Sequence, residues 1–141
     1  MTYAEKTEVP FDRSINEIQA LLRKRGAGQI FYGEDGGMFA VQFSLSDRMI
    51  RFRLPVTIPD SKRSRDQQRR SRARALLLVI KAKLESVDSS IETIEQAFLA
   101  NVVMSDGFTV HERIAEQMRL EYKTGQPDAM GLLPPPENAN G

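Results

Sequence analysis

The 141 residues of this chain are enough for one domain with one hydrophobic core, and 40% hydrophobic with 28% charged residues is typical of a globular protein. Cysteine is absent, which excludes a disulfide framework and a thiolate metal site, and the longest apolar run, six residues, is too short to cross a membrane. The net charge is only +1, yet residues 55–84 carry nine bases and two acids, whereas residues 85–141 carry three bases and ten acids. This asymmetry predicts either a basic face for an anion or neutralisation of one block by the other, within the fold or between subunits.

The first expected element is a helix that follows Pro10. Ser14 and Glu17 have the spacing of a capping box, which places the helix start at Ser14. The basic run of residues 23–25 suits the negative end of the helix dipole, and Gly26 can supply a left-handed cap. One apolar stripe follows the cap at helical spacing: Ile15, Ile18, Leu21 and Leu22.

Three strands are expected next. The first covers residues 29–33, and residues 34–37 make a turn rich in Gly. The second and third strands alternate apolar and polar residues with period two, which predicts an antiparallel sheet with one buried and one solvated face. Pro55 ends the third strand or places it at an edge, and Arg51 and Arg53 lie on its solvated face. The residues expected in the core are Phe39, Val41, Phe43, Leu45, Ile50, Phe52, Leu54 and Val56.

Residues 62–87 contain no Gly or Pro and consist mainly of good helix formers, so they predict one long central helix. Its second half is apolar nearly all round, which predicts burial between two other elements. Its first half carries seven bases in thirteen residues against one acid, Asp66. That half projects into water or onto an anionic partner, and residues 62–70 are alternatively a mobile segment. A core stripe follows at helical spacing: Ala73, Leu76, Leu77, Ile80, Leu84 and Val87.

Two further helices are expected after a break at residues 88–90. Ser89 and Glu92 predict the cap of the first, and Thr109 and Glu112 predict the cap of the second, which ends at Gly125. Residues 1–125 therefore form a single α+β domain, and residues 126–141 form a flexible tail rich in Pro, Gly and Asn. The apolar stripe of the first of these helices contains Ile91, Ile94, Phe98, Leu99, Val102 and Val103, and the stripe of the second contains Ile114, Ala115, Met118 and Tyr122.

No catalytic motif is present, so an enzyme, a cofactor and a metal site are not expected. His111 is the only histidine, and the chain contains no P-loop, nucleophile elbow or dinucleotide fingerprint. Metal-dependent nucleases use carboxylate clusters, but the acids of residues 85–95 lack the strand context of such a site and favour a solvated surface.

The candidate site is the group of basic residues around the central helix. Arg65, Arg69 and Arg72 repeat at i, i+4 and i+7 and share one helical face. Guanidinium groups bind phosphate in a bidentate manner and stay charged, while Phe31 and Tyr32 are candidates for stacking on unpaired bases. The expected nucleic-acid-binding residues are Arg51, Arg53, Lys62, Arg63, Arg65, Arg69, Arg70, Arg72 and Arg74.

Residues 69–114, RRSRARALLLVIKAKLESVDSSIETIEQAFLANVVMSDGFTVHERI, and residues 11–33, FDRSINEIQALLRKRGAGQIFYG, resemble a group of uncharacterised proteins of tailed phages and prophages. The resemblance covers most of the chain and implies a non-virion phage protein in the bacterial cytoplasm. Three strands followed by a long helix are also similar to the β-β-β-α unit of single-strand annealing proteins, which is an analogy of fold alone.

The expected function is that of a small nucleic-acid-binding accessory protein in replication, recombination or host takeover, with single-stranded DNA among the candidate ligands. The alternative is a non-enzymatic inhibitor or adaptor whose basic helix docks on an acidic protein surface. The absence of an apolar N-terminal segment argues against a signal peptide and favours the cytoplasm. A homo-oligomer is compatible with both functions.

Overall fold

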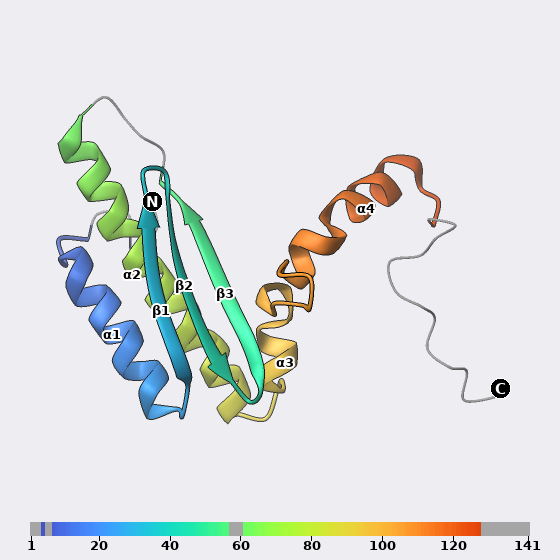
Figure 1. Ribbon diagram of the computed structural model, residues 1–141, viewed down its shortest axis with the longest axis horizontal. Helices are drawn as coiled ribbons and strands as arrows, with labels where there is room; N and C mark the ends of the chain where they lie inside the picture. The colour runs from blue at the N-terminus through green and yellow to red at the C-terminus, as the bar shows by residue number, and fades with distance from the viewer. Residues whose placement is uncertain (1–3, 5–6, 57–60, 128–141) are drawn as a thin grey trace.

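A computed structural model of the chain describes residue 4, residues 7–56 and residues 61–127. Three antiparallel strands form one sheet in the order β1-β2-β3, and α1 and α2 lie side by side on one face of it (Figure 1). The predicted α+β class, with an N-terminal helix, an antiparallel sheet and a long central helix, is confirmed. The elements are α1 (Phe11–Lys24), β1 (Gly28–Asp35), β2 (Met38–Leu45), β3 (Arg48–Pro55), α2 (Lys62–Asp88), α3 (Ile94–Ala97), the 3-10 turn η2 (Leu99–Asn101) and α4 (Val110–Thr124).

Helix α1 begins three residues earlier than the expected capping box. Pro10 occupies the N-cap position, and Ser14 is buried inside the helix, where its amide donates to the Pro10 carbonyl. The earlier start buries Phe11, whose ring meets that of Phe39 edge to face at 5.5 Å. The C-terminal end agrees with the prediction: Gly26 has a φ of 81°, and the Ala27 amide closes the helix on the Leu22 carbonyl.

The sheet follows the predicted alternation closely. The apolar residues of β2 that were expected in the core, from Phe39 to Leu45, are all buried, and β3 ends at Pro55 on the sheet edge. Ser46 and Asp47 join β2 to β3 with φ values of 49° and 60°, the left-handed pair of a tight hairpin turn. One extra residue in β1 shifts the register between Gly28 and Phe31, which is a β-bulge.

Helix α2 is continuous over 27 residues, so its basic first half is helical and is not a separate mobile segment. Ser61 caps it by accepting a hydrogen bond from the Ser64 amide at 3.0 Å. The predicted core stripe is confirmed, with Leu77 and Ile80 fully buried. The second half of α2 packs against other elements, as predicted, namely α1, α3 and the sheet, but one side of it stays open, since Val79 is 43% exposed.

The segment after α2 differs most from expectation. Ser89 caps no helix; the short helix α3 is capped by Thr93, whose hydroxyl accepts from the Gln96 amide while the Gln96 side chain accepts from the Thr93 amide. Val102 and Val103 are extended, and the Val103 amide donates to the Met49 carbonyl at 2.8 Å. The long amphipathic helix predicted here is therefore wrong, because β-branched residues instead pair with the free edge of β3.

Helix α4 begins and ends where its capping residues predict. Thr109 accepts from the Glu112 amide at 3.1 Å, and Gly125 adopts a φ of 70°. None of its residues is buried, and it projects away from the two-layer body (Figure 1). Most of the predicted flexible tail, residues 128–141, lies outside the described residues.

Candidate nucleic-acid interface

The nine basic residues expected to bind nucleic acid fall into two groups in the structure. The side chains of Arg51, Arg53, Arg69, Arg70 and Arg74 are held by other parts of the protein. The side chains of Lys62, Arg63, Arg65 and Arg72 are exposed, and none has an ion pair or a side-chain hydrogen bond within the described part of the chain.

Arg69 is fixed by contacts on three sides. Its Nε and Nη2 donate to the two carboxylate oxygens of Glu34, at 2.6 and 2.9 Å. Its guanidinium carbon lies 4.2 Å from the centroid of the Phe11 ring, which is cation–π geometry. The Tyr32 hydroxyl donates to the same carboxylate at 2.7 Å. Arg69 therefore joins α2 to β1 and α1, and it is a structural residue.

The same cluster shifts three ionisation equilibria. Burial, and then the hydrogen bond to Glu34, raise the pKa of Tyr32 to about 12. Burial alone would raise the pKa of Glu34, but hydrogen bonds from Arg69 and Tyr32 outweigh burial and hold that pKa below its usual range. The hydrogen bond to Glu34 in turn raises the pKa of Arg69. Tyr32 packs against Phe11 and Phe39, so it is not available for base stacking.

These shifts predict a stability change at high pH. Because folding raises the pKa of Tyr32 from 10.0 to about 12, its contribution to stability is complete below pH 10 and is lost as the pH rises to about 12. The phenolate absorbance of the folded protein should show a component near pH 12 that disappears in Tyr32→Phe. Tyr122→Phe, which alters a tyrosine 88% exposed on α4, should leave that component in place. Its persistence in Tyr32→Phe would contradict the assignment.

Two further arginines of α2 face α1 and the N-terminal segment. The Arg74 Nη1 donates to Glu17 on α1 at 2.8 Å, and the hydrogen bond from Arg74 lowers the pKa of Glu17. The Arg70 Nη2 donates to the Gln67 side chain at 2.6 Å, and the Gln67 amide donates to the Thr7 carbonyl. Arg74 therefore joins α2 to α1, whereas Arg70 is held within α2 by Gln67, which itself contacts the N-terminal segment.

Arg51 and Arg53 connect β3 to the start of α4. The Arg51 Nη2 donates to the Gly107 carbonyl at 2.6 Å and lies 3.5 Å from Glu112. The Arg53 Nη1 donates to the other oxygen of Glu112 at 3.2 Å. Arg51 is largely enclosed, whereas Arg53 is 47% exposed and keeps donors that face solvent.

The exposed group lies at the N-terminal end of α2. Lys62 and Arg65 line a hollow of about 440 Å³ together with the tip of the β1–β2 hairpin, and Arg72 lies on the same helical flank, about 10 Å further along the axis. The first turn of α2 contains no acid, although a helix N-terminus favours negative side chains. The lack of an acid in the first turn leaves this end of the helix open to an external anion, and the acids Glu34, Asp35 and Asp66 line the same hollow beside the cations.

The acidic half of the chain does not neutralise this group within the described residues. The ion pairs made by acids of residues 85–127 join Asp88 to Arg25, Glu95 to Arg48, and Glu112 to the two arginines of β3, or are local within the hairpin and α4. None of these pairs reaches the first half of α2. Neutralisation of the two blocks by each other inside one chain, an alternative raised by the charge asymmetry, is therefore wrong for the described part.

The carboxylates of residues 85–95 are spread among separate partners. Asp88 and Glu95 are paired with arginines, and Glu92 accepts from the Ser86 hydroxyl at 2.7 Å. No three acidic or histidine side chains in the described residues come together as a candidate metal site. His111 is exposed beside the two arginines of β3.

Comparison with known proteins does not assign the chain to a family. No family model, no curated protein and no solved structure matches the chain. The resemblance to proteins of tailed phages and prophages therefore stays a prediction. Among the described helices, none combines the length and the apolar character that a membrane crossing requires.

Proposed function

We propose that the protein is a non-enzymatic accessory protein that binds the phosphate backbone of nucleic acid through the exposed cations of α2, in replication, recombination or host takeover. The observation that carries the proposal is the division of the basic residues. Internal acids and carbonyls hold the arginines that stabilise the fold, whereas Lys62, Arg63, Arg65 and Arg72 remain exposed.

Guanidinium and ammonium groups on a helix can bind the phosphate backbone of a nucleic acid without contacting its bases. Arginine donates two parallel N–H bonds to one phosphate, and each neutralised phosphate releases condensed counterions. Such contacts position a ligand on the protein but carry no sequence information. The proposed mode of binding is therefore dependent on salt and tolerant of sequence.

The double variant Arg65→Gln with Arg72→Gln tests the proposal. Both side chains are exposed, so the melting temperature should change little. If each arginine neutralises one phosphate, the log–log dependence of affinity on salt should become shallower by about 1.4–1.8 units. Affinity for oligonucleotides of different sequence should fall by a similar factor. Fluorescence anisotropy over a series of salt concentrations measures both quantities.

The double variant Arg23→Gln with Lys24→Gln is the matched control. It removes the same charge from exposed residues at the C-terminal end of α1, the opposite end of the helical layer (Figure 1). We expect its salt dependence to stay close to that of the wild type. Equal losses in the two variants would mean that net charge alone governs affinity, and unchanged affinity of Arg65→Gln with Arg72→Gln at low salt would refute the proposal.

A second function fits the same exposed cations. They complement carboxylates as well as phosphates, which keeps an inhibitor or adaptor that docks on an acidic protein surface as the alternative. Capture of cell proteins on the immobilised chain, with and without nuclease, separates the two. A stoichiometric protein partner that survives nuclease and is lost in Arg65→Gln with Arg72→Gln would favour the adaptor.

A further inference from the structure

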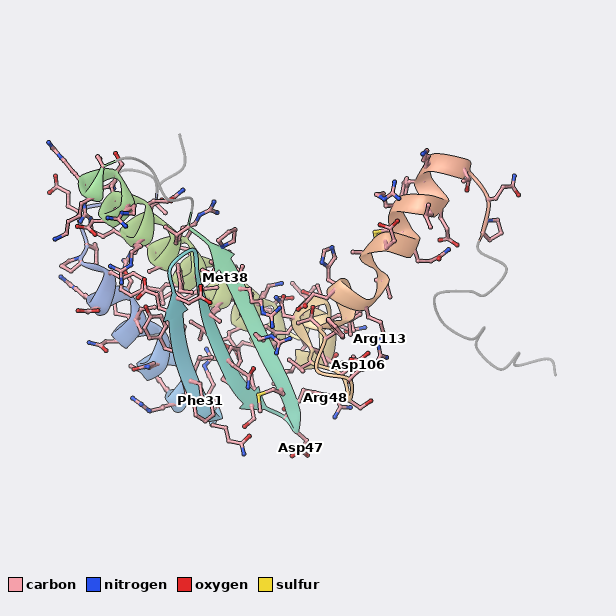
Figure 2. The ribbon with its side chains drawn as sticks, turned by 45° about the horizontal axis from the view of Figure 1, so that its top comes forward. Phe31, Met38, Asp47, Arg48, Asp106 and Arg113 are labelled. Carbon is pink, nitrogen blue, oxygen red and sulfur yellow. The ribbon has the colours of Figure 1, made fainter. Side chains whose placement is uncertain are left out.

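The face of the sheet opposite α1 and α2 carries an exposed aromatic ring. The Phe31 side chain is 62% exposed in the middle of β1, and Figure 2 places it away from the hairpin tip that carries Met38. Strand register aligns it directly with Gln42 of β2 and, beyond that, with Arg51 of β3. An aromatic ring, an amide and a guanidinium thus form one row across the sheet.

The neighbouring row leaves room above the sheet. Gly33 of β1 pairs with Ala40 of β2, which pairs with Arg53 of β3. Because Gly33 and Ala40 have small side chains, the ring of Phe31 is accessible from the solvent side of the sheet and from the side of this neighbouring row. No helix or strand of the described residues covers β1 and β2 on this face, whereas Gly107 and Glu112 contact the arginines of β3 at its other edge (Figure 1).

The strands contribute more basic than acidic side chains to the open face. Alternation places Arg51 and Arg53 on this face and one acid, Asp35, at the hairpin tip, while Glu112 of α4 pairs with both arginines at the β3 edge. Arg53 donates only one hydrogen bond, so most of its donors remain directed to solvent. An exposed ring on a surface that also carries cations, here two strands away, is the combination by which proteins bind unpaired bases together with their phosphates.

The open face is continuous with the proposed phosphate site. Met38 lies on the open face and also lines the hollow that contains Lys62 and Arg65. Along β2, Met38 lies about 14 Å from Gln42, the cross-strand neighbour of Phe31. A flexible single strand can follow this path over the hairpin tip, whereas the bases of a duplex are stacked inside and do not reach the ring.

We propose that the open face of the sheet is a binding site for single-stranded nucleic acid, in which an unpaired base stacks on Phe31 while its backbone continues towards the exposed cations of α2. This inference rests on the proposed function and adds a contact to the base and a preference for single strands.

The test uses a thymidine oligonucleotide of about 12 residues and an abasic strand with the same number of phosphates. The wild type should bind the thymidine strand more tightly than the abasic strand. Phe31→Leu should lose about 5- to 150-fold in affinity for the thymidine strand, as loss of one stacked base predicts, and should bind the abasic strand and a duplex as the wild type does. Phe31→Tyr, which keeps the ring, should retain the affinity.

Tyr122→Leu is the matched control, because it removes an aromatic ring that is 88% exposed on α4, the helix that projects away from the two-layer body (Figure 1). We expect it to bind both strands as the wild type does. Equal affinity of the wild type for thymidine and abasic strands would overturn the stacking site and leave backbone binding intact. The stacking site would also be overturned if the double variant Arg65→Gln with Arg72→Gln loses affinity while Phe31→Leu does not. Absence of all binding would overturn both the stacking site and the phosphate site.

Discussion

Replacing Leu77 with Ala is expected to lower the free energy of unfolding by about 2–5 kcal/mol. Leu77 is fully buried on the side of α2 that faces the sheet, between the two other core positions Ala73 and Ile80. The change removes apolar contacts and leaves a cavity that the surrounding core can only partly close. Urea denaturation followed by circular dichroism measures the loss, and Ile80→Ala should behave alike.

Leu78→Ala is the control for this prediction, because it makes the same chemical change one residue further along the same helix. Leu78 is 36% exposed, so fewer of its contacts are lost, and alanine is at least as good a helix former. We expect a clearly smaller effect than for Leu77→Ala. Equal losses at the two positions would mean that the helix is rotated relative to the sheet.

Local periodicity was sufficient to predict the elements of the two-layer body. The alternation in β2 and the helical spacing in the second half of α2 each repeat over several pleats or turns, so one face is apolar along all of β2 and along α2 from Ala73 onward. The ends were harder to predict. Helix α1 does not start at the capping pattern of Ser14 and Glu17. It starts earlier because Phe11 is buried against Phe39, a residue of a strand that is distant in the sequence.

The segment after α2 could not be predicted because its structure depends on a strand edge. Ile94, Phe98 and Val102 have helical spacing, yet Val102 pairs with Ile50 and the chain leaves the helix after α3. Periodicity alone cannot reveal that the edge of β3 is free to accept a partner. Ile91 shows the consequence, since this apolar residue is 75% exposed although its spacing placed it on the expected core stripe.

The candidate site was predicted only in part, because it too depends on contacts between distant parts of the chain. Arg65, Arg69 and Arg72 share one flank of α2, as their spacing predicts, but Arg69 is fixed by Glu34, a residue 35 positions earlier in the chain. Only the fold brings the tip of β1 to this helix, so the sequence could not distinguish the structural arginine from its exposed neighbours. The exposure of Phe31 could not be predicted either, because Ile30, Phe31 and Tyr32 are consecutive apolar residues and only the structure shows which of them faces solvent.

Phe98→Ala is expected to destabilise the fold by about 3–5 kcal/mol. Phe98 is fully buried, and its ring meets those of Phe43 and Phe52 edge to face at 6.0 and 6.3 Å. It lies between α3 and η2, so it is the main apolar anchor of the segment that leads to α4. The Lys83 ammonium, 5.8 Å from the ring centroid, also loses its cation–π contact.

Phe98→Ala should destabilise the segment after α2 more than the rest of the fold, because Phe98 holds this segment where it pairs with the edge of β3. The Val103 amide, which donates to the Met49 carbonyl, should exchange its hydrogen faster in Phe98→Ala than the amides of β2 do. Leu99→Ala is the control, since Leu99 is 50% exposed beside the anchor, and it should change neither the unfolding free energy nor this exchange by much. Uniform acceleration of all amides in Phe98→Ala would show instead that the C-terminal segment and the sheet unfold as one unit.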